Sequence, residues 1–351
     1  LWLHRTRSDT FHRIKRWLTI GEYIFFRVFG RAKVSYSVAS WSGLLDRVRL
    51  VWDEPLLAVL PISTDQLSPL IDADQPSSGL NGRFSDRWPA LRNIPWFPAI
   101  GDGAAANMGI GCISPHRIAL SMGTSSALRV LTTQRAEDLP SSLWCYQLDR
   151  LRTLVGGALT EGGNILDWMT KVLKVAKAPD LDAALAVMVP DSHGLTILPF
   201  LGGERSPGWA GSIQGAIHGL SLSTTSLDIL SAGLEAVALR LTLVRDDLVR
   251  VVPEAAQVIA SGGAFTHCPS WLQIIADALG QPVAASSVTE ASSRGVALFA
   301  LEALGVVPDG SSLPDTVKSI YEPDFEHHQR YRSALNRQQD LYRKLIRIRA
   351  D

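Results

Sequence analysis

The sequence has few cysteines and no long uninterrupted hydrophobic run. Its three cysteines, Cys112, Cys145 and Cys268, are widely separated, so no pair has metal-ligand spacing and no disulfide framework is indicated. No apolar run approaches the roughly 20 residues needed to cross a bilayer. The first thirty residues are interrupted by charge and do not have the order of a signal peptide. We therefore expect a protein of the reducing cytoplasm with no membrane partner.

An excess charge of either sign is also absent, because Lys plus Arg and Asp plus Glu each number 34. Balanced charge gives no global field that would attract nucleic acid. We interpret the basic stretch between Arg5 and Arg16 as a solvated helix face. The expected partners are small molecules, no nucleic acid is expected, and the sequence leaves the oligomeric state open.

Several catalytic motifs are missing. The chain has no G-x-S-x-G elbow, no G-x-x-x-x-G-K-[ST] loop and no H-E-x-x-H helix, which argues against an α/β-hydrolase, a P-loop phosphotransferase and a zinc protease. The histidines are scattered, and none has a partner at metal-ligand spacing.

The elements that the sequence does indicate alternate between strand and helix over the second half of the chain. A length of 351 residues is enough for two domains. Apolar residues at three- and four-residue spacing predict one long helix from Ser226 to Val251. The other predicted elements are a hairpin (117–122 and 126–131), strands at 143–148, 153–158, 196–200, 257–260 and 282–285, and helices at 269–279, 291–304 and from about 328.

The first hundred residues give weaker signals. We expect a first helix capped by Asp9 and a second from Ile20 to Phe29, ended by Gly30. Residues 60–98 are rich in Pro, Ser, Asp and Gly and are expected to be mostly loop. The chain begins at Leu1 rather than Met, which suggests a natural start further upstream.

Glycine-flanked polar residues are the candidates for chemistry. Asp102 lies between Gly101 and Gly103, where the backbone can approach a ligand, although a turn aspartate explains the pattern equally simply. Gly123, Thr124 and Ser125, at the tip of the predicted hairpin, offer amides and hydroxyls suited to phosphate, or they only form a turn.

Two further glycine pairs each follow a predicted strand. Gly162 and Gly163 open a helix whose N-terminus favours an anion, with a simple helix cap as the alternative. Gly262 and Gly263 would let a phosphate or a flat ring lie against the backbone, or they serve close packing. In the loop after residue 200, Glu204 and the adjacent Arg205 are interpreted as a structural ion pair.

The order of these loops resembles the FGGY carbohydrate kinases, which belong to the actin and hexokinase-like superfamily. The resemblance runs along nearly the whole chain. Its carriers are the segments 101–105, 123–125, 159–163, 198–207, 261–263 and 290–295, together with 215–220 followed by Asp228 and Ile229 as a near match in which Gly233 replaces a larger or hydroxylated residue.

The resemblance implies an α/β, ribonuclease H-like, two-lobed kinase with ATP and Mg²⁺. Residues 1–113 would be the remainder of the N-terminal lobe and 114–351 the C-terminal lobe. Asp102 would be the general base that accepts a proton from a sugar hydroxyl. The nucleotide would contact Gly123, Thr124, Ser125, Gly163, Gly262, Gly263 and His267, the last replacing an asparagine found in some relatives.

The segment from Asn107 to Val130, followed by Trp144-Cys145-Tyr146, is most similar to the gluconate kinase branch of that family. This implies phosphorylation of gluconate or a related sugar acid, with a xylulokinase-like enzyme for another sugar as the alternative. The Asp-x-Gly-Thr turn with which the family begins does not precede Asp102. The ligand of the metal is therefore expected outside this chain, and a non-catalytic protein of the same fold is the second hypothesis.

Overall fold

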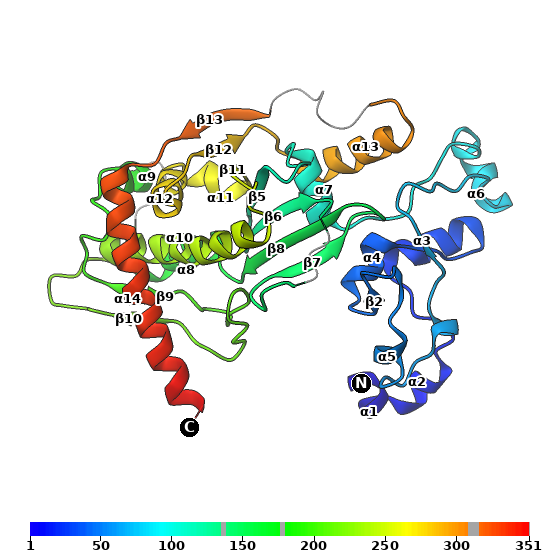
Figure 1. Ribbon diagram of the computed structural model, residues 1–351, viewed down its shortest axis with the longest axis horizontal. Helices are drawn as coiled ribbons and strands as arrows, with labels where there is room; N and C mark the ends of the chain where they lie inside the picture. The colour runs from blue at the N-terminus through cyan, green and yellow to red at the C-terminus, as the bar shows by residue number, and fades with distance from the viewer. Residues whose placement is uncertain (135–137, 176–179, 308–315, 351) are drawn as a thin grey trace.

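The fold centres on one large mixed sheet, seen in a computed structural model that describes residues 1–134, 138–175, 180–307 and 316–350 (Figure 1). Its seven strands lie in the order β13-β12-β11-β5-β6-β8-β7. They are β5 (Arg117–Met122), β6 (Ser126–Thr132), β7 (Trp144–Gln147), β8 (Thr153–Leu159), β11 (Gln257–Ser261), β12 (Val283–Ser286) and β13 (Val317–Tyr321).

The strand directions place three chain turns at one edge of this sheet. β5 and β11 are parallel, whereas β6 is antiparallel to both β5 and β8. Therefore β5, β8 and β11 all run the same way and end at the same edge. The predicted hairpin of β5 and β6 is confirmed, with Met122 opposite Ser126.

Helices cover both faces, and the alternation of side chains along the strands decides which residues meet which helix. Ile118, Leu120 and Leu128 point into the main core beneath α8 (Gly163–Leu173), α10 (Ser226–Val251) and α12 (Ser270–Leu279). Leu131 and Leu154 point to the other face, where they pack with α7 (Asp102–Gly109) and α13 (Ala291–Ala303). The helix α14 (Phe325–Ala350) crosses outside α10 (Figure 1).

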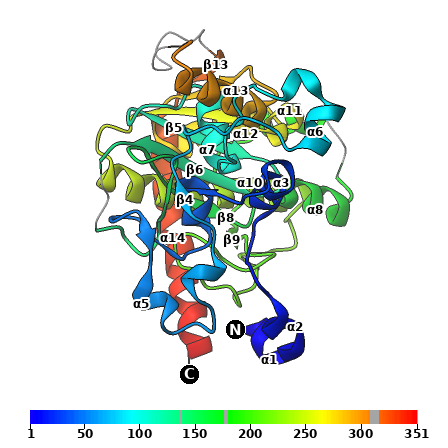
Figure 2. The same cartoon turned by 90° about the vertical axis from the view of Figure 1, so that its right-hand side faces the viewer.

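The N-terminal part is a looser set of short elements, drawn blue in Figure 1 and facing the viewer in Figure 2. A capping box of Thr19 and Glu22 begins α3, and Gly30 in the left-handed conformation ends it, as predicted. The prediction for Asp9 is wrong: it lies inside a helix whose N-terminal residue has no side-chain cap. The elements are α1 (Trp2–Thr6), α2 (Ser8–Arg13), α3 (Ile20–Phe29), β1 (Val34–Ser35), α4 (Tyr36–Trp41), β2 (Leu45–Asp46), β3 (Val51–Trp52), α5 (Glu54–Leu57), η1 (Thr64–Gln66), β4 (Leu70–Ile71), α6 (Gly82–Arg87) and η2 (Pro89–Leu91).

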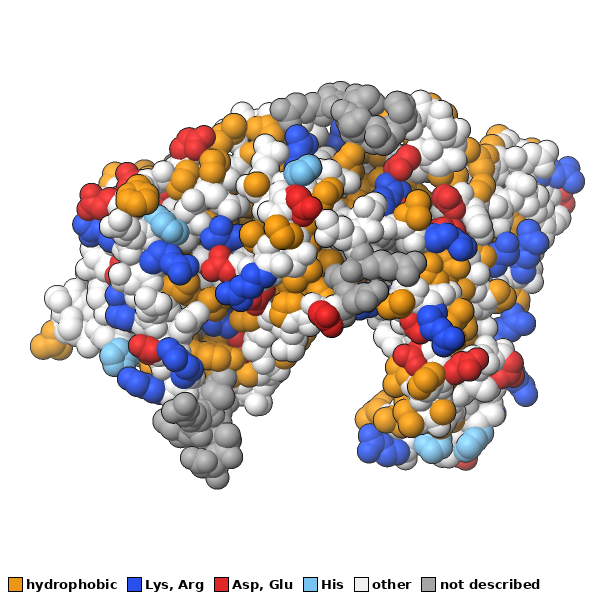
Figure 3. Space-filling model, in the orientation of Figure 1, with side chains coloured by type: hydrophobic (Ala, Val, Ile, Leu, Met, Phe, Trp, Pro, Cys, Tyr) orange, Lys and Arg blue, Asp and Glu red, His pale blue; other side chains and the backbone are white. Residues whose placement is uncertain are grey.

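The N-terminal part contacts the sheet body through α4 and the edge strand β7. The backbone N–H of Gln147 donates to Ser40 Oγ at 3.0 Å, and Trp41 packs against Tyr146 with ring centroids 5.6 Å apart. Below this contact the two parts diverge, and a notch separates them in the space-filling view (Figure 3). The remaining elements are α9 (Asp180–Ala186), β9 (Thr196–Leu198), β10 (Ala216–His218) and α11 (Gly263–His267).

No helix of the described residues is long and apolar enough to span a bilayer.

Candidate active site

Three glycine-containing turns meet where β5, β8 and β11 end. The Gly163 N–H donates to the Gly123 carbonyl at 2.7 Å, and the Asn164 N–H to the Thr124 carbonyl at 3.2 Å. A Cβ on Gly162 would lie 2.6 Å from the Ser125 carbonyl carbon, so only glycine lets the β8–α8 turn approach this closely. The structure thus brings the 123–125 and 162–164 turns, which are 35 residues or more apart in sequence, into direct contact.

The third turn joins the same surface. Gly262 has φ +124°, a conformation that disfavours other residues, and an added Cβ there would overlap the Met122 carbonyl at the end of β5. A Cβ on Gly163 would lie 3.4 Å from Ala264 Cβ, so the second and third turns also touch. In the sequence the glycine pairs are separate candidates. In the fold they are neighbours, because the strands that they follow end at the same edge of the sheet.

The N-terminus of α8 does not present its first amides to a ligand. The Gly162 N–H donates to Asn164 Oδ1 at 2.9 Å, while those of Gly163 and Asn164 are bonded to the hairpin turn. The anion site expected at this helix start is therefore replaced by a contact that holds residues 123–125 in place. Gly163 acts here as a close-packing residue.

The hairpin turn itself is available to an anion. Gly123, Thr124 and Ser125 are exposed. Among the described residues, no hydrogen-bond partner is found for the amides or hydroxyls of Thr124 and Ser125. A Cβ added to Gly123 or Gly263 would meet nothing within 4 Å among the described residues. Two free amides and two hydroxyls beside bare backbone suit phosphate oxygens.

His267 lies at the end of α11, four residues after Gly263. This spacing puts both residues on one side of the short helix, and both are exposed. A histidine at this point can contact a ligand bound over the third turn. It has no hydrogen-bond or ion-pair partner among the residues described.

Asp102 is the first residue of α7 and is exposed. Its Oδ1 accepts the Gly103 N–H at 2.7 Å, and the helix N-terminus favours a negative charge at this position. The flanking glycines each make room for a large side chain. A Cβ on Gly101 would lie 2.8 Å from Trp41 Cζ2, and one on Gly103 would lie 3.2 Å from Arg129 Nε.

The helix that carries Asp102 is fixed by α13. Added Cβ atoms at Gly109 and Gly295 would each overlap a backbone carbonyl of the opposite helix, so the two backbones are in contact through small residues. Arg294 donates to the carbonyl of Gly109 at the C-terminus of α7. The segment 290–295 therefore helps to position α7.

The sheet face beside Asp102 carries aromatic and cationic side chains that the sequence analysis did not single out as site residues. Arg129 of β6 is directly across from Gly156 of β8, which is across from Trp144 of β7. Trp144 and Tyr146 are in contact, with ring centroids 4.6 Å apart. An arginine inside an otherwise apolar strand, Ser-Ala-Leu-Arg-Val-Leu-Thr, was the signal that could have revealed this surface.

The ion pair expected between Glu204 and Arg205 is wrong. Glu204 is buried and bonded to Arg240 of α10 and to the Tyr342 hydroxyl. Arg205 is exposed, has no ion-pair partner among the described residues, and is close enough to Arg129 for its charge to lower the pKa of that arginine. Glu204 and Arg205 are adjacent in the loop but do not pair, because the side chain of Glu204 is buried in the core and that of Arg205 is exposed at the surface.

Glu161, directly before the second turn, is a buried carboxyl group. Burial raises its pKa to about 7, although hydrogen bonds from the Gly202 and Leu201 amides act against the shift. The Gly202 N–H lies 3.4 Å from Glu161 Oε1. Glu161 therefore ties the end of β8 to the loop that carries Arg205.

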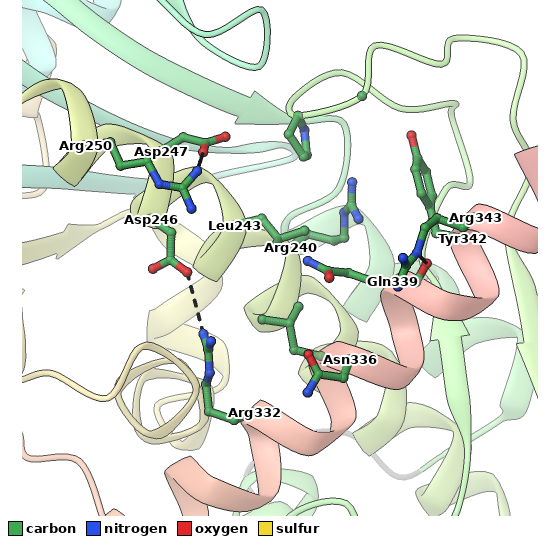
Figure 4. Close-up of a pocket in the computed structure, with 13 residues that line it drawn as sticks. Arg240, Leu243, Asp246, Asp247, Arg250, Arg332, Asn336, Gln339, Tyr342 and Arg343 are labelled. Carbon is green, nitrogen blue, oxygen red and sulfur yellow. Dashed lines mark hydrogen bonds and ion pairs between the residues drawn. The ribbon is translucent and has the colours of Figure 1, made fainter.

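Two other polar regions lie outside this surface. A cavity of about 540 Å³ between α10 and α14 contains several arginines (Figure 4). Four of its cations are already paired: Arg250 with Asp247, Arg332 with Asp246, Arg343 with Asp340 and Arg240 with Glu204. It therefore offers little uncompensated charge to a ligand.

The second region is the cluster of Asp191, His193 and Glu235. His193 Nδ1 accepts the Leu195 N–H at 3.0 Å, so Nε2 of the neutral ring carries the proton and donates to Glu235 at 3.0 Å. Asp191 is paired with Arg337. The cluster is satisfied without a metal ion and lies on elements that do not form the three turns.

Comparison with known proteins agrees with this architecture. The sequence profile of the FGGY family of carbohydrate kinases, N-terminal domain, matches residues 1–109, and that of the C-terminal domain matches residues 118–304. The chain is 27% identical to a gluconokinase of Bacillus subtilis (strain 168) over 331 residues, covering 91% of this chain and 64% of the relative. It is 25% identical to a xylulose kinase of Escherichia coli (strain K12), covering 80% of this chain and 58% of the relative. The chain thus spans somewhat under two thirds of the length of these curated relatives.

Solved structures show the same fold. A xylulose kinase and a gluconate kinase, both from Lactobacillus acidophilus, superpose with TM-scores of 0.90 and 0.89, each at 24% identity. The two alignments cover 98% of this chain, and 71% and 70% of the respective structures. The predicted fold class is confirmed.

Proposed function

Because the chain belongs to the FGGY family of carbohydrate kinases, we propose that its protein transfers the γ-phosphate of ATP to a hydroxyl of gluconate or a related sugar acid. Asp102 is the general base in this proposal. The observation that supports it is the arrangement at the sheet edge. An exposed carboxylate begins α7, and the next residue, Gly103, lies close to Arg129 of β6. Arg129 in turn donates at 2.7 Å to Ser121 Oγ of β5, the strand that ends at the exposed 123–125 turn.

The chemistry assigned to each part follows from its position. The free amides and hydroxyls of Thr124 and Ser125 hold phosphate oxygens, and the bare backbone at Gly262 and Gly263, with His267, lines the nucleotide. Asp102 accepts the proton of the attacking hydroxyl, which is aligned with the phosphoryl group. Positioning and electrostatic stabilisation supply most of the rate in such transfers.

The proposal includes Mg²⁺ only as an ion bound to the phosphates of ATP. Magnesium prefers oxygen ligands in octahedral geometry and is usually held by one or two carboxylates plus substrate phosphates. Among the described residues, the one three-residue group with ligand spacing is the satisfied Asp191 cluster. The proposal therefore assigns no magnesium ligand among the described residues, and no step above depends on one.

The sugar-acid assignment is supported by gluconokinase relatives at 27% and 28% identity. A kinase of a neutral sugar is the second candidate, favoured by the xylulose kinase fold neighbour and by the aromatic wall of Trp41, Trp144 and Tyr146. We retain the cytoplasm as the proposed compartment, because all three cysteines are free and buried.

The base assignment is tested by Asp102→Asn in the natural polypeptide that contains this sequence. We expect turnover, measured as sugar-dependent ADP release, to fall by about 10²- to 10⁴-fold, because the amide cannot accept the proton. Exposed Asp65 supplies the matched control, Asp65→Asn, which should leave turnover unchanged. Full turnover in Asp102→Asn would contradict the assignment, and ADP release that ignores every sugar would instead favour a non-catalytic protein.

A further inference from the structure

Arg129 is a half-buried cation without a carboxylate partner among the described residues. It lies in the middle of β6, and no ion pair joins it to any residue that the structure describes. Nη1 donates to Ser121 Oγ at 2.7 Å, which is its one side-chain hydrogen bond among these residues. A charge that is partly removed from water is stabilised by an ionic partner or by several hydrogen bonds. The remaining donors of this guanidinium have neither among the described residues, so they are available for a ligand.

The surroundings increase the positive charge at this point. Burial lowers the pKa of Arg129, the charge of Asp102 opposes that shift, and nearby Arg205 adds to it. An arginine nevertheless remains protonated in proteins. The charges of Asp102 and Arg205 are therefore both close enough to act on the Arg129 guanidinium, and Asp102 is exposed.

The position of Arg129 separates it from the phosphate loop. The side chain is on the sheet face covered by α7, whereas the exposed turn 123–125 is at the strand end. Arg129 lies three positions after Ser126 along β6, roughly 10 Å of backbone. Its neighbours on this face are Gly103 and Tyr146, which lie beside the proposed base rather than beside the turn.

We propose that Arg129 is a specificity-determining residue that binds the carboxylate of a sugar-acid substrate. This inference rests on the proposed kinase function and deepens it. The planar guanidinium forms paired hydrogen bonds with a carboxylate. The rings of Trp144 and Tyr146, across β8 from Arg129, provide an apolar surface on the same sheet face. Phosphate transfer then requires a hydroxyl of the same substrate to reach Asp102.

Glycine at position 156 is part of the same arrangement. It lies between Arg129 and Trp144 across the sheet, and an added Cβ would lie 2.7 Å from Trp144 Cη2. The missing side chain lets the Trp144 ring lie over β8. The subsite is therefore formed by three adjacent strands, which keeps it rigid.

The test compares D-gluconate with D-glucitol, which replaces the carboxylate by a CH₂OH group on the same carbon chain. In the natural polypeptide, Arg129→Met should lower kcat/KM for gluconate by about 10- to 100-fold, as expected for the loss of a charge-assisted hydrogen bond. The value for glucitol should change by less than about threefold, because a hydroxymethyl group does not need the cation. Arg129→Lys should restore part of the gluconate activity, since it keeps the charge and loses the fork geometry.

Binding is measured separately from turnover, by calorimetry with gluconate in the absence of ATP. The matched control is Arg330→Met, an exposed arginine of α14 paired with Glu326, which should bind gluconate like the wild type. Thermal unfolding of each variant shows whether the fold is retained. If Arg129→Met does not fold, Arg129→Lys provides the comparison.

Each outcome separates the inference from the proposed function. Gluconate binding that is lost in Arg129→Met supports the inference even where no phosphate is transferred. Equal losses for gluconate and glucitol would show that Arg129 acts through Asp102 or the fold and would overturn it. A wild type that phosphorylates neutral sugars and does not bind gluconate would overturn it while leaving the kinase function intact.

Discussion

At the scale of single residues, ionisation of the Glu161 carboxyl group makes the free energy of unfolding depend on pH. Its folded-state pKa of about 7 is above its ordinary value of 4.5, so the folded protein holds a proton that the unfolded chain releases. Between these two values a rise in pH therefore lowers the free energy of unfolding, and above about pH 7 this contribution is lost. A neutral isostere at this position should remove that part of the pH dependence.

We expect Glu161→Gln to become more stable relative to wild type as the pH rises from 5 to 8, by up to about 3 kcal/mol. Chemical denaturation at both values measures the difference. Exposed Glu326, replaced in Glu326→Gln, is the control and should show no such change. A difference between Glu161→Gln and wild type that is constant across this range would mean that the carboxyl is already ionised at pH 5.

The sequence indicates Asp102 and the turn glycines as candidate site residues, but it does not indicate Arg129, and the reason is physical. Glycines flanking a carboxylate stand out in the sequence, because each one implies backbone that must approach something closely. Arg129 becomes a candidate binding residue only because it lies across from Gly156 and close to Gly103. Both contacts are set by tertiary structure. The same holds for Glu204, whose partner Arg240 is 36 residues away.

At the scale of elements, the packing of α7 against α13 controls the position of the proposed base. Gly295 lies against the Ala105 carbonyl and the Gly109 amide, so the helices approach each other without an intervening side chain. α13 was predicted from Ala291 to Leu304 and is observed from Ala291 to Ala303, but its close crossing with α7 has no sequence signal beyond the glycine itself. β13 and α11 were not predicted, since one is largely exposed and the other is a single short turn after Gly262.

Gly295→Ala should therefore destabilise the protein by about 1 to 3 kcal/mol, because the added methyl group overpacks a backbone contact. In an unconstrained helix the same substitution would stabilise by up to about 1 kcal/mol, so the sign of the change is diagnostic. Displacement of α7 should also lower kcat by roughly tenfold or more. Thermal unfolding and the ADP-release assay measure the two effects.

The control for this element is Ser293→Ala, at an exposed position of α13. It should change neither stability nor turnover appreciably. Stabilisation by Gly295→Ala with full activity would show that the two helices can separate without moving Asp102.

At the scale of the whole molecule, one sheet supports two ligand regions that differ in construction. The proposed nucleotide region consists of backbone at the strand ends, where the three turns touch. The proposed sugar region consists of side chains on the face under α7, namely Trp144, Tyr146 and Arg129. Strand direction fixes the first region, whereas the sequence predicted only the alternation of strands and helices. Cross-strand register, which the sequence did not predict, fixes the second.

This separation predicts that affinity for the two substrates can be changed independently. Gly263 has space above it and no left-handed φ, so Gly263→Val should fold normally while its side chain occupies the place proposed for the nucleotide. We expect ADP affinity, measured by calorimetry, to fall by about tenfold or more, with gluconate affinity unchanged. The control is Gly82→Val, which also begins a helix and also has open space at Cβ. Since Arg129→Met should have the reverse effect, equal losses of both ligands in either variant would mean that the two regions are one coupled site.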